Sequence, residues 1–206
     1  MKEESDIADA LPFIGLFGLG DILDENPSDY QWNDKKKLFV NSKTGKMLTA
    51  RQMRNLIDEI ITYLIAQVPT LPEDSQIVRD AYSDFWSTFV IALTATYLLG
   101  AGGKPVYTDA KEAIDQMLRE QLDYYQRFGD QIAKGDLSIA QIQDRFRMYA
   151  NSLRGVYQQG RLRAYGLDIY PVPGTVKCGS NCRCTLSIRE YRNRWEIRWI
   201  RSAWVS

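Results

Sequence analysis

Histidine is absent from this chain of 206 residues, and only three cysteines are present. Without an imidazole base, a nucleophile of the Cys-His type cannot be built, and the H-E-x-x-H zinc-protease motif is excluded. The phosphate loop G-x-x-x-x-G-K-[ST] and the dinucleotide fingerprint G-x-G-x-x-G are also missing from the sequence. We therefore expect no catalytic residues and no enzymatic activity.

Net charge is likewise lacking, because 26 lysines and arginines balance 26 aspartates and glutamates. This balance gives no indication of general binding to polyanions. A membrane partner is not expected either, since the longest uncharged run, 85–103, is interrupted by serine, threonine and glycine and is interpreted as a buried helix. The first residues, MKEESD, are acidic, whereas a secretory signal would begin with basic residues.

Four segments carry apolar residues at three- and four-residue spacing, which predicts amphipathic helices. Their expected ranges are 50–67, 74–99, 109–134 and 139–165. Thr49 with Gln52, and Ser138 with Gln141, have the spacing of capping boxes, and prolines or glycines follow each segment. Because amphipathic stripes on short-linked helices are best buried against one another, we predict a mainly α fold, a bundle of about four helices.

Two short hairpins are expected at the ends of this bundle. Near the N-terminus, 37–40 and 46–48 flank a turn that contains glycine, a spacing typical of a β-hairpin. Near the C-terminus, apolar and polar residues alternate over 184–188 and again over 195–199, which predicts a terminal β-hairpin. A helix beginning at Tyr191 is the alternative, because Trp195 and Trp199 are four residues apart.

The pattern divides the chain into an apolar arm at 1–30, a helical body with its leading hairpin at 31–167, and a cysteine knuckle with a basic tail at 168–206. In the arm, Phe13, Leu16 and Phe17 are candidate contacts to a partner protein. The alternative is that the arm packs on its own domain, since exposed apolar patches are unusual on soluble monomers.

The tail interleaves arginine with tryptophan, the residues most enriched at interface hot spots. Its candidate partner-binding residues are Arg194, Trp195, Arg198, Trp199 and Trp204. The alternative is an amphipathic strand that turns its tryptophans inward and its arginines to water. Contact with DNA is less favoured, because the basic run is short and the rest of the chain is neutral.

All three cysteines lie close together in a C-x3-C-x-C pattern formed by Cys178, Cys182 and Cys184. Three thiolates supply three of the four ligands of a structural zinc site, and the fourth would be a carboxylate such as Asp168, a water or a partner's residue. A disulfide from Cys178 to one of the other two is a second interpretation, and free buried thiols are a third.

Three stretches resemble the minor head, or head-morphogenesis, proteins of tailed bacteriophages, the group that includes the phage Mu-type minor head protein. They are LFVNSKTGKMLTARQMRNLIDEII at 38–61, the central helical segments with their Gly-Gly break, and YPVPGTVKCGSNCRCTLSIRE at 170–190. Fuller members of this group carry a further C-x-x-C upstream of the closing knuckle. Here 157–163 holds no cysteine, so a metal site of the family type lacks its first pair of ligands.

The resemblance implies a non-enzymatic virion protein that acts at or near the portal vertex, in the region of the head-tail connector. Its partners would be portal, major capsid or neck proteins, in multiple copies within a symmetric assembly built in the bacterial cytoplasm. The alternative function is a small nucleic-acid-binding module that uses the cysteine knuckle and the basic tail.

Overall fold

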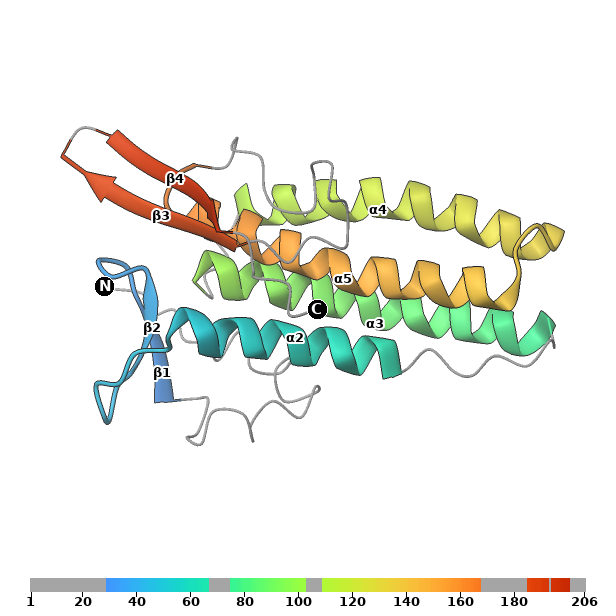
Figure 1. Ribbon diagram of the computed structural model, residues 1–206, viewed down its shortest axis with the longest axis horizontal. Helices are drawn as coiled ribbons and strands as arrows, with labels where there is room; N and C mark the ends of the chain where they lie inside the picture. Colours follow the sequence, from blue (N-terminus) through green and yellow to red (C-terminus); the bar gives the residue numbers. More distant parts are fainter. Residues whose placement is uncertain (1–28, 67–74, 103–108, 168–184, 193, 201–206) are drawn as a thin grey trace.

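The computed structural model describes residues 29–66, 75–102, 109–167, 185–192 and 194–200. These ranges contain four long helices: α2 (Ala50–Ala66), α3 (Ser75–Ala101), α4 (Asp109–Lys134) and α5 (Ile139–Ala164). They also contain two antiparallel hairpins: β1 (Tyr30–Asn33) with β2 (Leu38–Asn41), and β3 (Thr185–Tyr191) with β4 (Arg194–Ile200). The helices run along the long axis of the molecule, and both hairpins lie at the same end (Figure 1). The expected mainly helical fold and the terminal β-hairpin are confirmed, whereas the three cysteines lie outside the described residues.

The helix starts follow the capping signals in the sequence. At α2, the Gln52 amide N–H donates to Thr49 Oγ1 at 3.2 Å, and the Thr49 N–H donates to Gln52 Oε1 at 2.9 Å. At α5, Ser138 and Gln141 exchange the same two bonds, at 3.3 and 2.8 Å. Each box satisfies two helix N–H groups that have no partner within the helix. The capping predictions are therefore confirmed.

The α3 and α5 backbones meet at a pair of glycines. A Cβ built on Gly100 would lie 2.3 Å from the backbone oxygen of Tyr157, and one built on Gly160 would lie 2.2 Å from the backbone oxygen of Tyr97. No side chain larger than hydrogen fits at either position without moving a helix. Glycine thus sets the distance between the two central helices, and α3 and α5 form the most extensive helix contact in the described structure.

Helix α3 contains the buried helical run that the sequence predicted, and it contacts the three other long helices. Its segment 80–101 is long and apolar enough to cross a membrane by length and composition, and 56% of that window is buried inside the protein. Helices α2, α4 and α5 each pack against α3. The largest fully buried side chains of the core include Tyr125, Phe39, Phe89, Phe128, Phe146, Leu56 and Ile60.

Helix α4 is packed less completely than its apolar stripe predicted. Tyr125 and Phe128 are buried, but Leu122, placed on the buried side by its spacing, is 36% exposed. The α4 and α5 backbones stand apart, with aromatic rings between them: Phe128 lies 5.3 Å from Phe146 and 6.2 Å from Tyr149, centroid to centroid. This separation leaves part of the α4 stripe facing solvent.

The predicted N-terminal hairpin is present, and a strand that the sequence did not indicate precedes it. Strand β2 pairs with the preceding β1, with Tyr30 opposite Asn41 and Asn33 opposite Leu38. The expected partner, 46–48, lies along β2 through an antiparallel bridge between Val40 and Met47, and the Leu48 N–H donates to the Phe39 backbone oxygen at 2.9 Å. Gly45 takes a left-handed conformation in the turn between them, at φ 71°. The β1–β2 turn contains no glycine, and its left-handed position is taken by Lys37, at φ 51°. A turn without glycine gave no signal for β1 in the sequence.

Candidate interaction surfaces

The C-terminal hairpin has two chemically different faces. In its register, Leu186 lies opposite Trp199 and Glu190 lies opposite Trp195, so the tryptophans share one face with leucine. Leu186 is 2% exposed, and Trp195 and Trp199 are half-buried. Since side chains alternate along a strand, the opposite face carries the arginines Arg189, Arg194 and Arg198.

The tryptophan face is held against the end of α5. The Arg161 guanidinium donates from Nη1 to the backbone oxygen of Leu186 at 2.8 Å and to Gln158 Oε1 at 2.9 Å. The Trp195 ring meets Tyr165 edge-on, with centroids 5.2 Å apart. A small apolar cluster around Leu162 and Leu186 completes this junction. Among the described residues, Arg161 and a layer of apolar and aromatic side chains thus attach the hairpin to the bundle.

The arginine face carries its own network of polar contacts. Tyr191 donates from its hydroxyl to Glu196 Oε2 at 3.1 Å, and Arg198 donates from Nε to Glu196 Oε1 at 2.8 Å. The hydrogen bond from Arg198 is the main reason why the pKa of the Glu196 carboxyl is lowered. The Arg194 guanidinium lies 5.5 Å from the Tyr191 ring centroid. Glu196 thus offsets part of the positive charge on an otherwise basic face.

The predicted partner-binding residues of the tail do not form one patch. Arg194 and Arg198 are exposed on the outer face, whereas Trp195 and Trp199 lie on the inner face. This arrangement favours the alternative in which the tryptophans turn inward and the arginines face water. The remaining predicted residues of the arm, tail and knuckle lie outside the described ranges: Phe13, Leu16, Phe17, Cys178, Cys182, Cys184 and Trp204.

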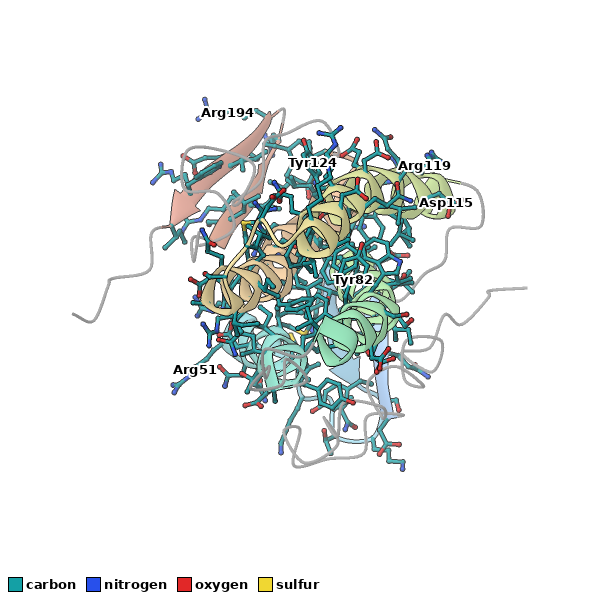
Figure 2. All side chains as sticks on the ribbon, turned by 90° about the vertical axis from the view of Figure 1, so that its right-hand side faces the viewer. Arg51, Tyr82, Asp115, Arg119, Tyr124 and Arg194 are labelled. Carbon is teal, nitrogen blue, oxygen red and sulfur yellow. The ribbon has the colours of Figure 1, made fainter. Side chains whose placement is uncertain are left out.

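A groove between α4 and α5 was not predicted from the sequence. It has a volume of about 430 Å³. Its walls include Tyr124, Arg127 and Gln131 of α4 and Arg145, Met148 and Tyr149 of α5. Tyr124, labelled in Figure 2, is 60% exposed, and Met148 is 43% exposed. Both residues fall outside the helix stripes that we used to assign the core, so only a search for large apolar residues off the stripes would have indicated them.

The groove is basic as well as apolar. The Arg127 guanidinium lies 5.7 Å from the Tyr124 ring centroid, and the Arg145 guanidinium lies 5.5 Å from that of Phe128. Within the described residues neither arginine is in an ion pair, and the lining includes no carboxylate. Burial raises the pKa of Tyr149 to about 12, although the nearby Arg145 acts against this rise. Two cations thus face a groove whose described lining residues supply no anion.

In the described parts of the chain, no three cysteine, aspartate or glutamate side chains come close enough together to hold a metal ion. This finding does not bear on the predicted zinc ligands, which lie outside those parts. No protein-family profile, curated protein or solved structure matches the chain. The resemblance to phage minor head proteins therefore stays a prediction from the sequence.

Proposed function

We propose that this protein is a non-enzymatic structural component of a tailed-phage virion, a minor capsid or head-morphogenesis protein that acts at or near the portal vertex. The observation that carries the proposal is the order of elements along the chain. A turn leads into a capped helical body, and the Asn-Cys-Arg-Cys motif at 181–184 then precedes β3, the first strand of the C-terminal hairpin. The phage proteins that the chain resembles have their elements in this order. The proposed location at the portal vertex is taken from the same resemblance.

Two features of the described structure support a role in assembly: a tightly packed helical body and exposed surfaces that are free to contact other proteins. The close contact of Gly100 with Gly160 and the aromatic core hold the helices in one arrangement. The basic face of the hairpin and the α4–α5 groove are exposed. In this account, the body is a spacer, while the arm and the surfaces contact neighbouring virion proteins such as portal, major capsid or neck proteins.

The cysteine knuckle has a structural role in this proposal. Cys178, Cys182 and Cys184 supply three thiolates, one fewer than a closed structural zinc site needs. The chain therefore fits zinc only with a fourth ligand from Asp168, from water or from a partner. Elemental analysis of the purified protein, with a count of free thiols, distinguishes zinc, a disulfide and free cysteines.

Deletion of residues 1–23 tests the role of the arm in assembly. We expect the truncated protein to fold, with the helical circular dichroism of the full chain, but to be missing from purified particles. The matched control is a full-length chain with the exposed Gln126 of α4 changed to alanine, which should enter particles normally. Normal incorporation of the truncated protein would show that the arm is not a docking segment.

A nucleic-acid-binding module is the second candidate, favoured by the exposed arginines Arg189, Arg194 and Arg198 on one face of the hairpin. Phosphate contacts release counterions, so such binding weakens steeply as salt is raised. Titration of the purified full chain with duplex DNA at two salt concentrations discriminates the candidates. Tight binding that weakens with salt supports the module, and absence of binding supports the assembly role.

A further inference from the structure

The α4–α5 groove exposes large side chains with apolar surface on both of its walls. Tyr124 and Met148, on opposite walls, are 60% and 43% exposed. The amide oxygen Oε1 of Gln131, also in the lining, is buried and finds no hydrogen-bond donor among the described residues. An apolar groove that also holds an unsatisfied acceptor suits an occupant with apolar side chains and N–H groups, that is, a peptide segment.

The charge of the groove restricts the occupant further. Arg127 and Arg145 stand on opposite walls, and neither has an ion pair with any residue that the structure describes. A cation without an ion pair gains a charge-assisted contact from an anionic partner. The occupant that fits is therefore both apolar and acidic.

The chain itself contains a segment of this composition. Residues 1–28 hold one lysine and seven acidic residues, and these seven are Glu3, Glu4, Asp6, Asp9, Asp21, Asp24 and Glu25. Between the two acidic groups lies the apolar run LPFIGLFGLG at 11–20. The sequence of the arm thus complements the groove in both charge and polarity.

We propose that the α4–α5 groove binds the acidic, apolar arm, residues 7–25, of a second copy of this chain. The inference rests on the proposed function, because it assumes several copies in one assembly. In the assembly, the groove is then the site at which the arm of a neighbouring copy binds.

The position of β1 favours an arm from a neighbouring copy. Strand β1 begins at Tyr30, directly after residues 1–29 of the arm, and lies on the α2 side of the bundle, whereas α4 lies on the opposite side (Figure 1). The arm therefore joins the body on the side away from α4, and an arm that bound the groove of its own copy would have to pass around the bundle. A contact from the arm of one copy to the groove of the next is heterologous, and its repetition builds a closed ring or a filament.

The test uses the full-length protein with a photo-cross-linking amino acid in place of Met148. Chains labelled with ¹⁵N and unlabelled chains are purified separately, mixed and irradiated, and the cross-linked peptides are identified by mass spectrometry. We expect cross-links between the groove position of one chain and residues 7–25 of the other isotopic form. Cross-links confined to single chains, or an absence of arm peptides, would overturn the inference.

Charge reversal provides the second arm of the experiment. Changing Arg127→Glu and Arg145→Glu together places like charges beside the arm and should lower the cross-link yield about tenfold. Changing Asp21→Lys and Asp24→Lys in that background should restore the yield. The matched control is Arg119→Glu, an exposed residue of the same helix outside the groove, labelled in Figure 2, which should leave the yield unchanged. An unchanged yield after reversal of both groove arginines would also overturn the inference.

The inference and the proposed function fail in different ways. Absence of the protein from viral particles overturns the proposed function, whatever the cross-links show. Presence in particles without arm-to-groove cross-links overturns only the inference.

Discussion

Tyr82 of α3 and Tyr125 of α4 hydrogen-bond to each other's backbone. The Tyr82 hydroxyl donates to the backbone oxygen of Tyr125 at 2.7 Å, and the Tyr125 hydroxyl donates to that of Tyr82 at 2.6 Å. The two rings stack with centroids 4.2 Å apart. Gly129, one turn beyond Tyr125, makes room for the Tyr82 ring, because a Cβ there would lie 2.8 Å from it. This reciprocal pair joins α4, the least covered helix, to the core.

Removing one hydroxyl of this pair should weaken the fold measurably. Tyr125 is 1% exposed, so Tyr125→Phe deletes a buried hydrogen bond and should lower the free energy of unfolding by about 1–2 kcal/mol. Tyr82→Phe is the matched variant, and the double variant completes a cycle that measures the coupling of the two bonds. Urea denaturation gives all three values. A change below about 0.3 kcal/mol in both single variants would contradict the importance of the pair.

Because α3 and α5 touch at two glycines, we expect an alanine substitution there to destabilise the protein. Glycine to alanine within a helix normally stabilises by about 1 kcal/mol. Here Gly160→Ala would place a methyl group against the Tyr97 backbone oxygen, so we expect a loss of about 2–3 kcal/mol or more. Thermal or chemical unfolding measures it, with Gln126→Ala on the exposed face of α4 as the control. A stabilised Gly160→Ala protein would show that the helices are not in contact there.

The capped helices could be predicted from the sequence because their signals are local. Thr49 with Gln52 and the stripe of α5 depend only on spacing within one helix, and both are confirmed. The contact of Gly100 with Gly160 could not be predicted, because it joins residues 60 positions apart and glycine alone does not indicate what approaches it. Strand β1 was missed because Lys37 takes the left-handed position of its turn without glycine.

The α4–α5 groove could not be predicted from the sequence, whereas the strand of the tail could. Alternation along β4 predicted a strand, and of the two alternatives for its side chains the register supports the one with tryptophans and arginines on different sides. The groove depends on the distance between α4 and α5, and that distance is set by Phe128, Phe146 and Tyr149, which come from both helices. Spacing within one helix contains no information about such a distance.

Stability should fall at alkaline pH because core tyrosines resist ionisation. Burial raises the pKa of Tyr149 to about 12, and it also raises the pKa values of Tyr82 and Tyr125 above the usual 10.0. A folded-state pKa above the unfolded value means that the contribution is complete below pH 10 and is lost as pH rises toward 12. Each tyrosine lowers the free energy of unfolding by at most about 1.4 kcal/mol per pH unit in this window.

Urea unfolding at several pH values between about 8 and 11 measures this dependence. Tyr149→Phe removes one of the titrating groups, so its stability should fall less steeply than that of the unaltered protein. Lysines titrate in the same range, and comparison of the two proteins cancels their contribution. Identical slopes for both proteins would contradict the burial of the Tyr149 hydroxyl in the folded state.

Arg161 should control how firmly the C-terminal hairpin is attached. Arg161→Ala removes the hydrogen bond to the Leu186 backbone oxygen, so amide hydrogen exchange in β3 and β4 should become about tenfold faster. Exchange in α3 should stay slow, because the bundle core does not depend on this bond. The control is Arg147→Ala, which removes only a surface ion pair with Asp144. Equal exchange in the hairpins of both variants would show that Arg161 is not the anchor.

The proposed function requires this protein to be part of a viral particle, where it contacts other proteins. The most direct measurement is mass spectrometry of purified particles from a host that produces this chain, combined with electron microscopy of particles carrying a tagged copy. We predict several copies per particle, located at the single vertex that carries the tail. A protein found only outside particles, as a monomer that converts a substrate, would contradict the account.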